Sequence, residues 1–341
     1  MEKEVEDLFG DHVLKAAARL FGLKAEGFKQ LGNFENYVYE ADKDGVAKIL
    51  RLTHSSHRTE AEVAGEMDWI DFLLKQGVDI PKYDHSLQGN RTEKILTGAS
   101  YFTAVVFEKA EGKHAKASDP EIWNEALFKE WGRITGHMHR ETRGYQPPTA
   151  HANRPLWDED DLYKNAKNYI RLGDEFVLER LDALLKHLSS LPITADSYGL
   201  IHTDIHSGNF FVDQGRIRVF DFDDCCYLWF VHDIAIPLYY SLSWGVPASY
   251  EGNRLAFAAD FFQAFWQGYV DEYQLSHEWL AQMPTFLKLR DVTLYLVINK
   301  KLEDMDENTS RWMEEIKDRI KQDAPIVDID YLAIIGLMDY Y

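Results

Sequence analysis

The residues with the greatest capacity for chemistry lie in one short stretch, residues 200–224, which reads LIHTDIHSGNFFVDQGRIRVFDFDD. This stretch contains two histidines, five aspartates and one asparagine. Short polar side chains often satisfy backbone groups in loops, so a structural role is one interpretation. Clustered carboxylates repel one another unless a cation or hydrogen-bond donors compensate them, so a purely structural role accounts poorly for five aspartates.

A metal-dependent hydrolase is a second interpretation. Asp204, His206 and Asp221 are residue types that ligate one or two metal ions. The run DIHSG, residues 204–208, resembles the first motif of calcineurin-type phosphoesterases. Those enzymes need further Gly-Asp and Gly-Asn-His elements downstream, and the run GNR at residues 252–254 lacks the histidine.

Phosphoryl transfer accounts for the spacing best. It needs an aspartate that accepts the proton of the attacking group, an asparagine five positions later that holds Mg²⁺, and a second aspartate beyond a short hairpin. Asp204, Asn209 and Asp221 have this spacing, and the run DQG at residues 213–215 supplies the turn. Mg²⁺ prefers oxygen ligands, which these side chains offer.

Two motifs follow one another in this stretch, His202-x-Asp204-x-x-x-x-Asn209 and the run DFDD at residues 221–224. Together they resemble the aminoglycoside phosphotransferase and choline kinase family, which includes homoserine kinase type II-like members and has a protein-kinase-like fold. The resemblance implies that Asp204 is the catalytic residue and that Asn209 and Asp221 bind Mg²⁺. It covers about residues 28–240.

The upstream half resembles the same family in the same order. Residues 31–39 (LGNFENYVY) match the loop that bends over the nucleotide phosphates, which implies nucleotide contacts from Gly32 and Asn36. Arg51 falls where the family places a lysine or arginine on the third strand, and arginine keeps the charge that phosphate needs. Lys48 should lie on the opposite face of that strand, because side chains alternate.

The phosphate-binding arginine needs a carboxylate partner on the following helix. Glu62 and Glu66 both qualify, and spacing favours Glu66. Glu108 and Ala110 resemble the segment whose backbone contacts adenine. In the second half of the chain, the resemblance implies a structural role for Asp233, and His139 is expected to be a core residue.

Hydrophobic periodicity predicts the elements that position these residues. An amphipathic helix is expected over residues 3–21, and Ser55 or Ser56 is expected to cap a second helix. Short apolar runs bounded by turn residues predict strands at 26–32, 36–40, 46–52, 91–96 and 101–107. Later periodic segments predict helices at 123–138 and 177–188, a hairpin over 210–220, and further helices to about 321.

The expected fold class is therefore α+β, with the two lobes of a protein-kinase-like fold. Residues 1–108 should form a nucleotide-binding lobe, which combines a small antiparallel sheet with one crossing helix. Residues 109–341 should form a larger, mainly helical lobe that carries the catalytic loop and the acceptor site. A chain of 341 residues is long enough for both.

Composition restricts the partners. The net charge of −20 argues against a nucleic-acid surface, because nucleic-acid binding depends on phosphate neutralisation. No apolar run reaches the roughly 18 residues of a membrane span, so no membrane partner is expected. The only cysteines, Cys225 and Cys226, are adjacent and offer no disulfide framework, which favours the cytoplasm.

Taken together, the sequence predicts an ATP- or GTP-dependent phosphotransferase. It would transfer the γ-phosphate to a hydroxyl of a small molecule, including amine-bearing metabolites and aminoglycosides. Asp223 and Asp224 either suit such an amine or brace the loop. One alternative is a pseudokinase that only binds nucleotide, against which the presence of Asp204, Asn209, Asp221 and a basic strand residue argues. Another is a protein kinase, but no Ala-Pro-Glu element or long activation segment follows the run DFD at residues 221–223. The sequence does not define the oligomeric state.

Overall fold

The computed structural model describes residues 3–148, 154–302 and 305–336. The chain divides into two compact units. The first comprises Met1–Glu111 with Tyr145–Arg154, and the second comprises Gly112–Gly144 with Pro155–Tyr341. The first unit holds an antiparallel sheet and the second is mainly helical, so the predicted α+β class is confirmed.

The first unit is built on one antiparallel sheet with the order β1-β2-β3-β6-β4, in which β5 also pairs with β6. The strands are β1 (Lys29–Gly32), β2 (Tyr37–Lys43), β3 (Val46–His54), β4 (Tyr83–Asp84), β5 (Glu93–Thr97) and β6 (Ser100–Glu108). The β2–β3 turn places Asp44 and Gly45 at positive φ, as the predicted hairpin requires.

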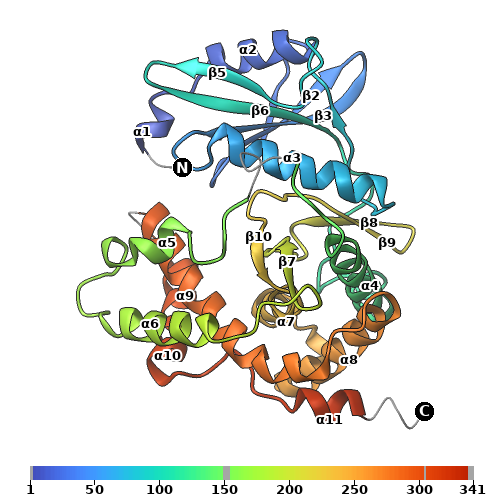
Figure 1. Cartoon of the computed structure of the whole chain (residues 1–341), viewed down its shortest axis with the longest axis vertical. Helices are drawn as coiled ribbons and strands as arrows, with labels where there is room; N and C mark the ends of the chain where they lie inside the picture. Colours follow the sequence, from blue (N-terminus) through green and yellow to red (C-terminus); the bar gives the residue numbers. More distant parts are fainter. Residues whose placement is uncertain (1–2, 149–153, 303–304, 337–341) are drawn as a thin grey trace. The chain divides into compact units, whose positions relative to one another are not determined.

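Two helices lie on opposite faces of this sheet, α2 (Asp11–Phe21) and α3 (Glu60–Lys75) (Figure 1). Leu50 and Leu52 of β3 belong to the apolar core that includes α2. Because side chains alternate along a strand, Arg51 faces the other side, toward α3.

Two boundaries predicted for these helices were wrong. The single helix expected over residues 3–21 is divided into α1 (Lys3–Glu6) and α2, because the backbone at Gly10 is extended. The cap of α3 is Thr59 rather than Ser55 or Ser56. Thr59 and Glu62 form a reciprocal capping box, which satisfies backbone donors that a helix start leaves without partners.

The second unit is a helical assembly with two small antiparallel sheets. Its longer helices are α4 (Glu125–Thr142), α6 (Phe176–Ser189), α7 (Val231–Trp244), α8 (Arg254–Glu272), α9 (Met283–Lys301) and α10 (Glu307–Gln322). Two shorter ones are α5 (Asp161–Lys164) and α11 (Tyr331–Gly336). Among the described residues, none of the helices combines the length and apolarity that crossing a membrane requires.

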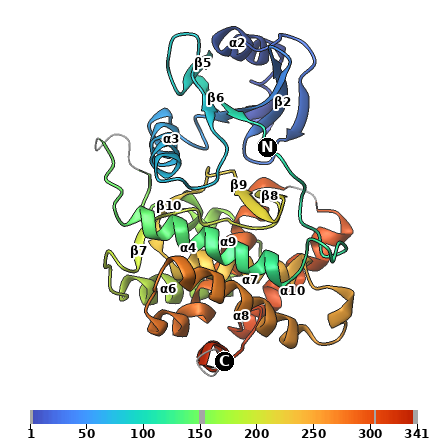
Figure 2. The same cartoon turned by 90° about the vertical axis from the view of Figure 1, so that its right-hand side faces the viewer.

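Helices α4 and α8 approach each other closely, because glycines lie at their crossing (Figure 2). A Cβ atom on Gly132 would lie 1.8 Å from the carbonyl oxygen of Phe265, and one on Gly268 would lie 1.8 Å from that of Lys129. Residues larger than glycine would therefore force the helices apart, which explains glycine inside two long helices.

The strands of the two small sheets lie within and directly beside the polar stretch of residues 200–224. Strands β8 (Phe210–Asp213) and β9 (Arg216–Val219) form the predicted hairpin. Strand β7 (Tyr198–Ile201) precedes this hairpin in the sequence, strand β10 (Cys226–Trp229) follows it, and the two strands pair with each other. This second pair was not predicted, because each strand has only four residues and gives no readable alternation.

Candidate active site

The β8–β9 hairpin returns the chain to the catalytic loop. Its turn residues Gln214 and Gly215 have φ values of 49° and 80°, the geometry of a tight hairpin turn. The backbone N–H of Phe220 then donates to the carbonyl oxygen of Asn209 at 2.9 Å. Asp221, the next residue, is thereby returned to the neighbourhood of Asn209, as the spacing predicted.

The loop between β7 and β8 fixes Asp204 relative to Asn209. Asn209 Nδ2 donates to the Asp204 backbone oxygen at 3.0 Å and to Asp204 Oδ2 at 3.2 Å. Because the amide nitrogen is used in this way, Asn209 Oδ1 is the atom left to bind a cation. The Asp221 carboxylate is exposed. An amide oxygen and a carboxylate suit Mg²⁺, so these residues fit the predicted metal site.

A buried aspartate organises the start of this loop. Asp233 accepts hydrogen bonds from the backbone N–H groups of His202 (3.0 Å) and Thr203 (2.7 Å). It also lies 3.3 Å from the His139 ring, which is 1% exposed and contacts the Tyr269 hydroxyl. Burial acts to raise the pKa of Asp233, but the hydrogen bond with His139 and the electrostatic effect of the neighbouring histidines outweigh it and lower the pKa. The geometry matches the structural role expected for Asp233 and the core position expected for His139.

Neither histidine of the motif offers an uncommitted ring to a metal. His202 Nε2 lies 3.1 Å from the Phe220 carbonyl oxygen, and its Nδ1 accepts from the backbone N–H of Asp204. Burial lowers the pKa of His202, so its ring is neutral at pH 7. His206 Nδ1 accepts from Gly208 N, and its Nε2 lies 3.5 Å from Asp204 Oδ2. These contacts commit both ring nitrogens of His202 and Nδ1 of His206, which disfavours the hydrolase interpretation.

The structure adds an arginine that the motifs did not reveal. Arg290 Nη2, from α9, contacts Asp204 Oδ1 and the hydroxyl of Tyr240 from α7. Burial acts to raise the pKa of Asp204, but the charge of Arg290 and the contact with His206 lower it well below its ordinary value. Asp204 is therefore ionised at neutral pH. No sequence signal pointed to Arg290, because it lies 86 positions from Asp204 in an unremarkable helical pattern.

Aromatic side chains extend from this ion pair. The rings of His206 and Tyr240 have centroids 4.7 Å apart, and those of Tyr240 and Trp244 are 4.5 Å apart. Trp244 also contacts Trp312, at 6.0 Å, and is 54% exposed. Trp244 is thus separated from the Asp204–Arg290 pair by the rings of His206 and Tyr240, and its exposed ring offers a flat apolar surface to a ligand.

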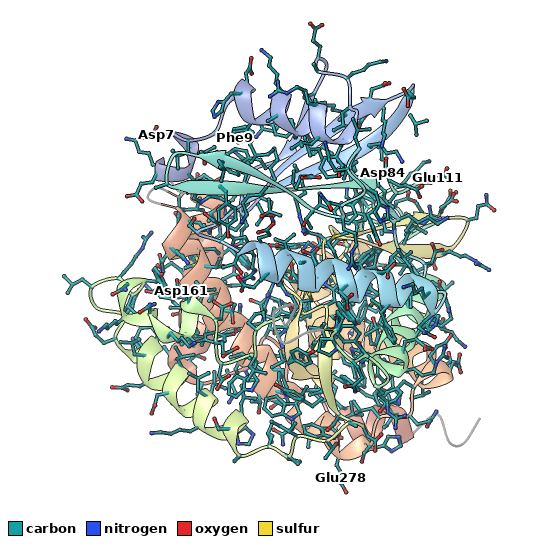
Figure 3. All side chains as sticks on the ribbon, turned by 45° about the horizontal axis from the view of Figure 1, so that its top comes forward. Asp7, Phe9, Asp84, Glu111, Asp161 and Glu278 are labelled. Carbon is teal, nitrogen blue, oxygen red and sulfur yellow. The ribbon has the colours of Figure 1, made fainter. Side chains whose placement is uncertain are left out.

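The first unit contains the predicted ion pair between β3 and α3. Arg51 Nη1 and Nη2 donate to the two carboxylate oxygens of Glu66 at 2.7 and 2.5 Å, and the Glu66 side chain is fully buried. The choice between Glu62 and Glu66 is thus decided, since Glu62 belongs to the capping box. Lys48 faces away and donates to Asp84 at 2.9 Å; Asp84 is labelled in Figure 3.

The remaining predicted nucleotide residues lie at the ends of strands. Gly32 ends β1 beside a register shift, and apart from its chain neighbours no described residue has an atom within 4 Å of the position a Cβ would take. Asn36 immediately precedes β2; its Oδ1 is buried and has no hydrogen bond among the described residues. Glu108 ends β6 and Ala110 follows it, buried. Nucleotide binding by these residues, by Arg51 and by Glu66 stays a prediction.

Comparison with known proteins points in the same direction. The model of the phosphotransferase enzyme family (APH) matches residues 27–278. The chain is 35% identical over 339 residues to amicoumacin kinase of Bacillus subtilis (strain 168), covering 98% of this chain and 99% of that protein.

Solved structures extend the likeness to three dimensions. A structure of amicoumacin kinase hAmiN in complex with AMP-PNP, Ca²⁺ and Ami superposes with a TM-score of 0.91 at 35% identity, covering 98% of this chain and 100% of that one. A microcompartment-associated aminopropanol kinase gives 0.71 at 21% identity, with 91% and 95% covered, and supports the fold alone. The predicted protein-kinase-like fold is confirmed.

Proposed function

Because this chain belongs to the phosphotransferase enzyme family and is a small-molecule kinase, we propose that it transfers the γ-phosphoryl group of ATP to a hydroxyl of an amicoumacin-like acceptor. The single observation that carries the proposal is the set of contacts around Asp204. An ionised carboxylate is held by Asn209, one hairpin away from Asp221, in a chain similar over its whole length to an amicoumacin kinase. ATP is favoured over GTP because the similar structure contains an ATP analogue.

In the proposed reaction, Asp204 orients the acceptor hydroxyl and receives its proton. The hydroxyl oxygen forms a bond to the γ-phosphorus while the bond from that phosphorus to the bridging oxygen breaks, and ADP leaves. The lowered pKa of Asp204 makes it a weak base. A weak base is sufficient if the transition state is loose, because the attacking oxygen then loses its proton late.

Asn209 and Asp221 would hold a divalent cation, which we propose to be Mg²⁺. Such an ion would neutralise charge on the nucleotide phosphates. Two protein ligands make an incomplete shell, so binding should depend on nucleotide. Titration calorimetry checks this: tight Zn²⁺ binding without nucleotide would contradict the assignment and revive the hydrolase interpretation.

Residues of the first unit are proposed to bind the nucleotide. Arg51 would offer its charge to the phosphates while Glu66 fixes its guanidinium, an arrangement suited to planar, bidentate recognition. Gly32 and Asn36 would contact the phosphates from the loop before β2. The backbone from Glu108 to Ala110 would contact the base. We propose the cytoplasm as the location, which the adjacent cysteines favour.

Acceptor-dependent ATP consumption tests the proposed function. The protein is incubated with ATP or GTP, Mg²⁺ and a panel of amicoumacin, aminoglycosides, choline and homoserine, and ADP is measured alongside the phosphorylated acceptor. We expect one molecule of phosphorylated amicoumacin for each ADP, and no release of inorganic phosphate. Nucleotide binding without transfer to any acceptor would favour a pseudokinase instead.

A further inference from the structure

The carboxylate proposed to receive the acceptor's proton already contacts a fixed positive charge. Besides its contact with Asp204, Arg290 donates from Nε to the Tyr240 hydroxyl at 3.1 Å. Its guanidinium carbon lies 4.9 Å from the centroid of the Tyr240 ring. Helices α7 and α9, which carry these two residues, pack against each other. The guanidinium is therefore held by the protein on two sides.

This arginine lies outside the part of the chain that the family model matches, which ends at residue 278. The motifs shared with the family therefore do not assign it a role. Arg290 Nη1 makes no hydrogen bond among the residues that the structure describes, although Nε and Nη2 both do. Arginine stays protonated at all physiological pH values, so this nitrogen is a permanent donor beside Asp204.

We propose two roles for Arg290. It positions Asp204, and it selects substrates in which the group next to the reacting hydroxyl is neutral or anionic and can accept a hydrogen bond, such as an amide carbonyl or a carboxylate. The inference rests on the proposed kinase function. Arg290 Nη1, which makes no hydrogen bond among the described residues, would donate to such an oxygen. An ammonium group at the same place would be repelled by the guanidinium of Arg290, because this arginine already compensates the negative charge of Asp204.

Two neighbouring features define the limits of this selection. The carboxylate of Asp224 also acts electrostatically on Arg290, so a second carboxylate besides Asp204 partly offsets the positive charge of the guanidinium. The exposed ring of Trp244 continues the surface beyond Tyr240. The acceptor we infer is thus a molecule with an apolar or aromatic body, a hydroxyl at Asp204 and a carbonyl or carboxylate oxygen beside it.

The positioning role is tested with Arg290→Gln, Arg290→Lys and the control Lys288→Gln. Lys288 lies on the same helix and pairs with Asp323, so the control removes one charge from α9 without touching Asp204. With ATP and amicoumacin, Arg290→Gln should lower kcat/KM for the acceptor by about 100-fold, the lower end of a proton-transfer contribution. The KM for ATP should be unchanged, and Arg290→Lys should recover part of the loss.

The proposed selection against a positive charge beside the hydroxyl is tested with matched pairs of acceptors. Each pair consists of an amino alcohol and its N-acetyl derivative, and the first pair is ethanolamine and N-acetylethanolamine. Wild type should prefer the amide by about tenfold, as expected for nearby like charges that water largely screens. Arg290→Gln should reduce this preference toward equality. Where neither compound is phosphorylated, their inhibition of amicoumacin phosphorylation is compared, with the same order expected.

These outcomes separate the two proposals. If wild type phosphorylates no acceptor, the proposed function fails. If wild type is active but Arg290→Gln retains acceptor turnover and preference, the inference about Arg290 is wrong. A loss in Arg290→Gln that is accompanied by an equal loss in Arg290→Lys and by a lower melting temperature in both would mean that the arginine is only structural, which also overturns the inference.

Discussion

The ion pair of Arg51 and Glu66 allows folding and function to be separated by mutation. Glu66→Ala removes the partner of a buried guanidinium. The lost contacts are two charge-assisted hydrogen bonds of 2.7 and 2.5 Å that the Arg51 guanidinium donates to a carboxylate with no exposed surface. Such bonds contribute about 1.5–3 kcal/mol each, and removal of one member of a buried pair typically costs about 3–5 kcal/mol. We expect the free energy of unfolding to fall by about 4 kcal/mol on this basis.

The double variant Arg51→Met with Glu66→Leu should behave differently. Apolar residues of similar volume need no partner, and replacing a whole buried ion pair in this way is often neutral or stabilising by about 1–4 kcal/mol. We therefore expect the double variant to unfold at the wild-type urea concentration or above it, yet to bind ATP weakly. Urea denaturation and nucleotide titration measure the two properties. A double variant that is stable and binds ATP normally would refute the proposed role of Arg51.

Three other features of the structure can be tested by mutation. Gly132→Ala should destabilise the second unit by about 3 kcal/mol or more in urea denaturation, because the new Cβ would lie 1.8 Å from a backbone oxygen of α8. Gly144→Ala should not destabilise it, because a Cβ there would lie 3.5 Å from the carbonyl oxygen of Glu141. Burial lowers the pKa of His232 to about 4, so the unfolded chain binds a proton at this histidine at a higher pH than the folded chain does. The free energy of unfolding should therefore fall by about 3 kcal/mol between pH 6.5 and pH 4. His232→Gln should flatten this part of the plot of stability against pH. Lys48→Ala should change the KM for ATP by less than about twofold, since Lys48 pairs with Asp84 on the face of the sheet opposite Arg51. Arg51→Lys should retain part of the function that Arg51→Ala loses.

The local parts of the site were predictable from the sequence. Asp204, Asn209 and Asp221 lie within eighteen positions, and the hairpin between them has its own turn signal. Their geometry is therefore set by short-range chemistry. The pairing of Arg51 with Glu66 was predictable for a similar reason, because strand alternation and helix spacing restrict the choice to a few residues.

The unpredicted parts depend on distant segments or on competing local signals. Arg290 reaches Asp204 only because α7 and α9 pack together, and neither helix carries a motif that announces this contact. The cap of α3 was misplaced because Ser55, Ser56 and Thr59 are all good caps. The decisive feature was Glu62, which completes a capping box only with Thr59.

The proposed role of Asp204 is tested most sharply by phosphoryl transfer in Asp204→Asn, with Asp213→Asn on the adjacent β8–β9 hairpin as the matched control. Transfer from γ-labelled ATP to amicoumacin is measured together with ATP affinity. We expect Asp204→Asn to lose about 10²–10⁴-fold in turnover while it binds ATP as wild type does, and Asp213→Asn to retain turnover. Full activity of Asp204→Asn, or an equal loss in Asp213→Asn, would contradict the assignment of Asp204 as the group that receives the acceptor's proton.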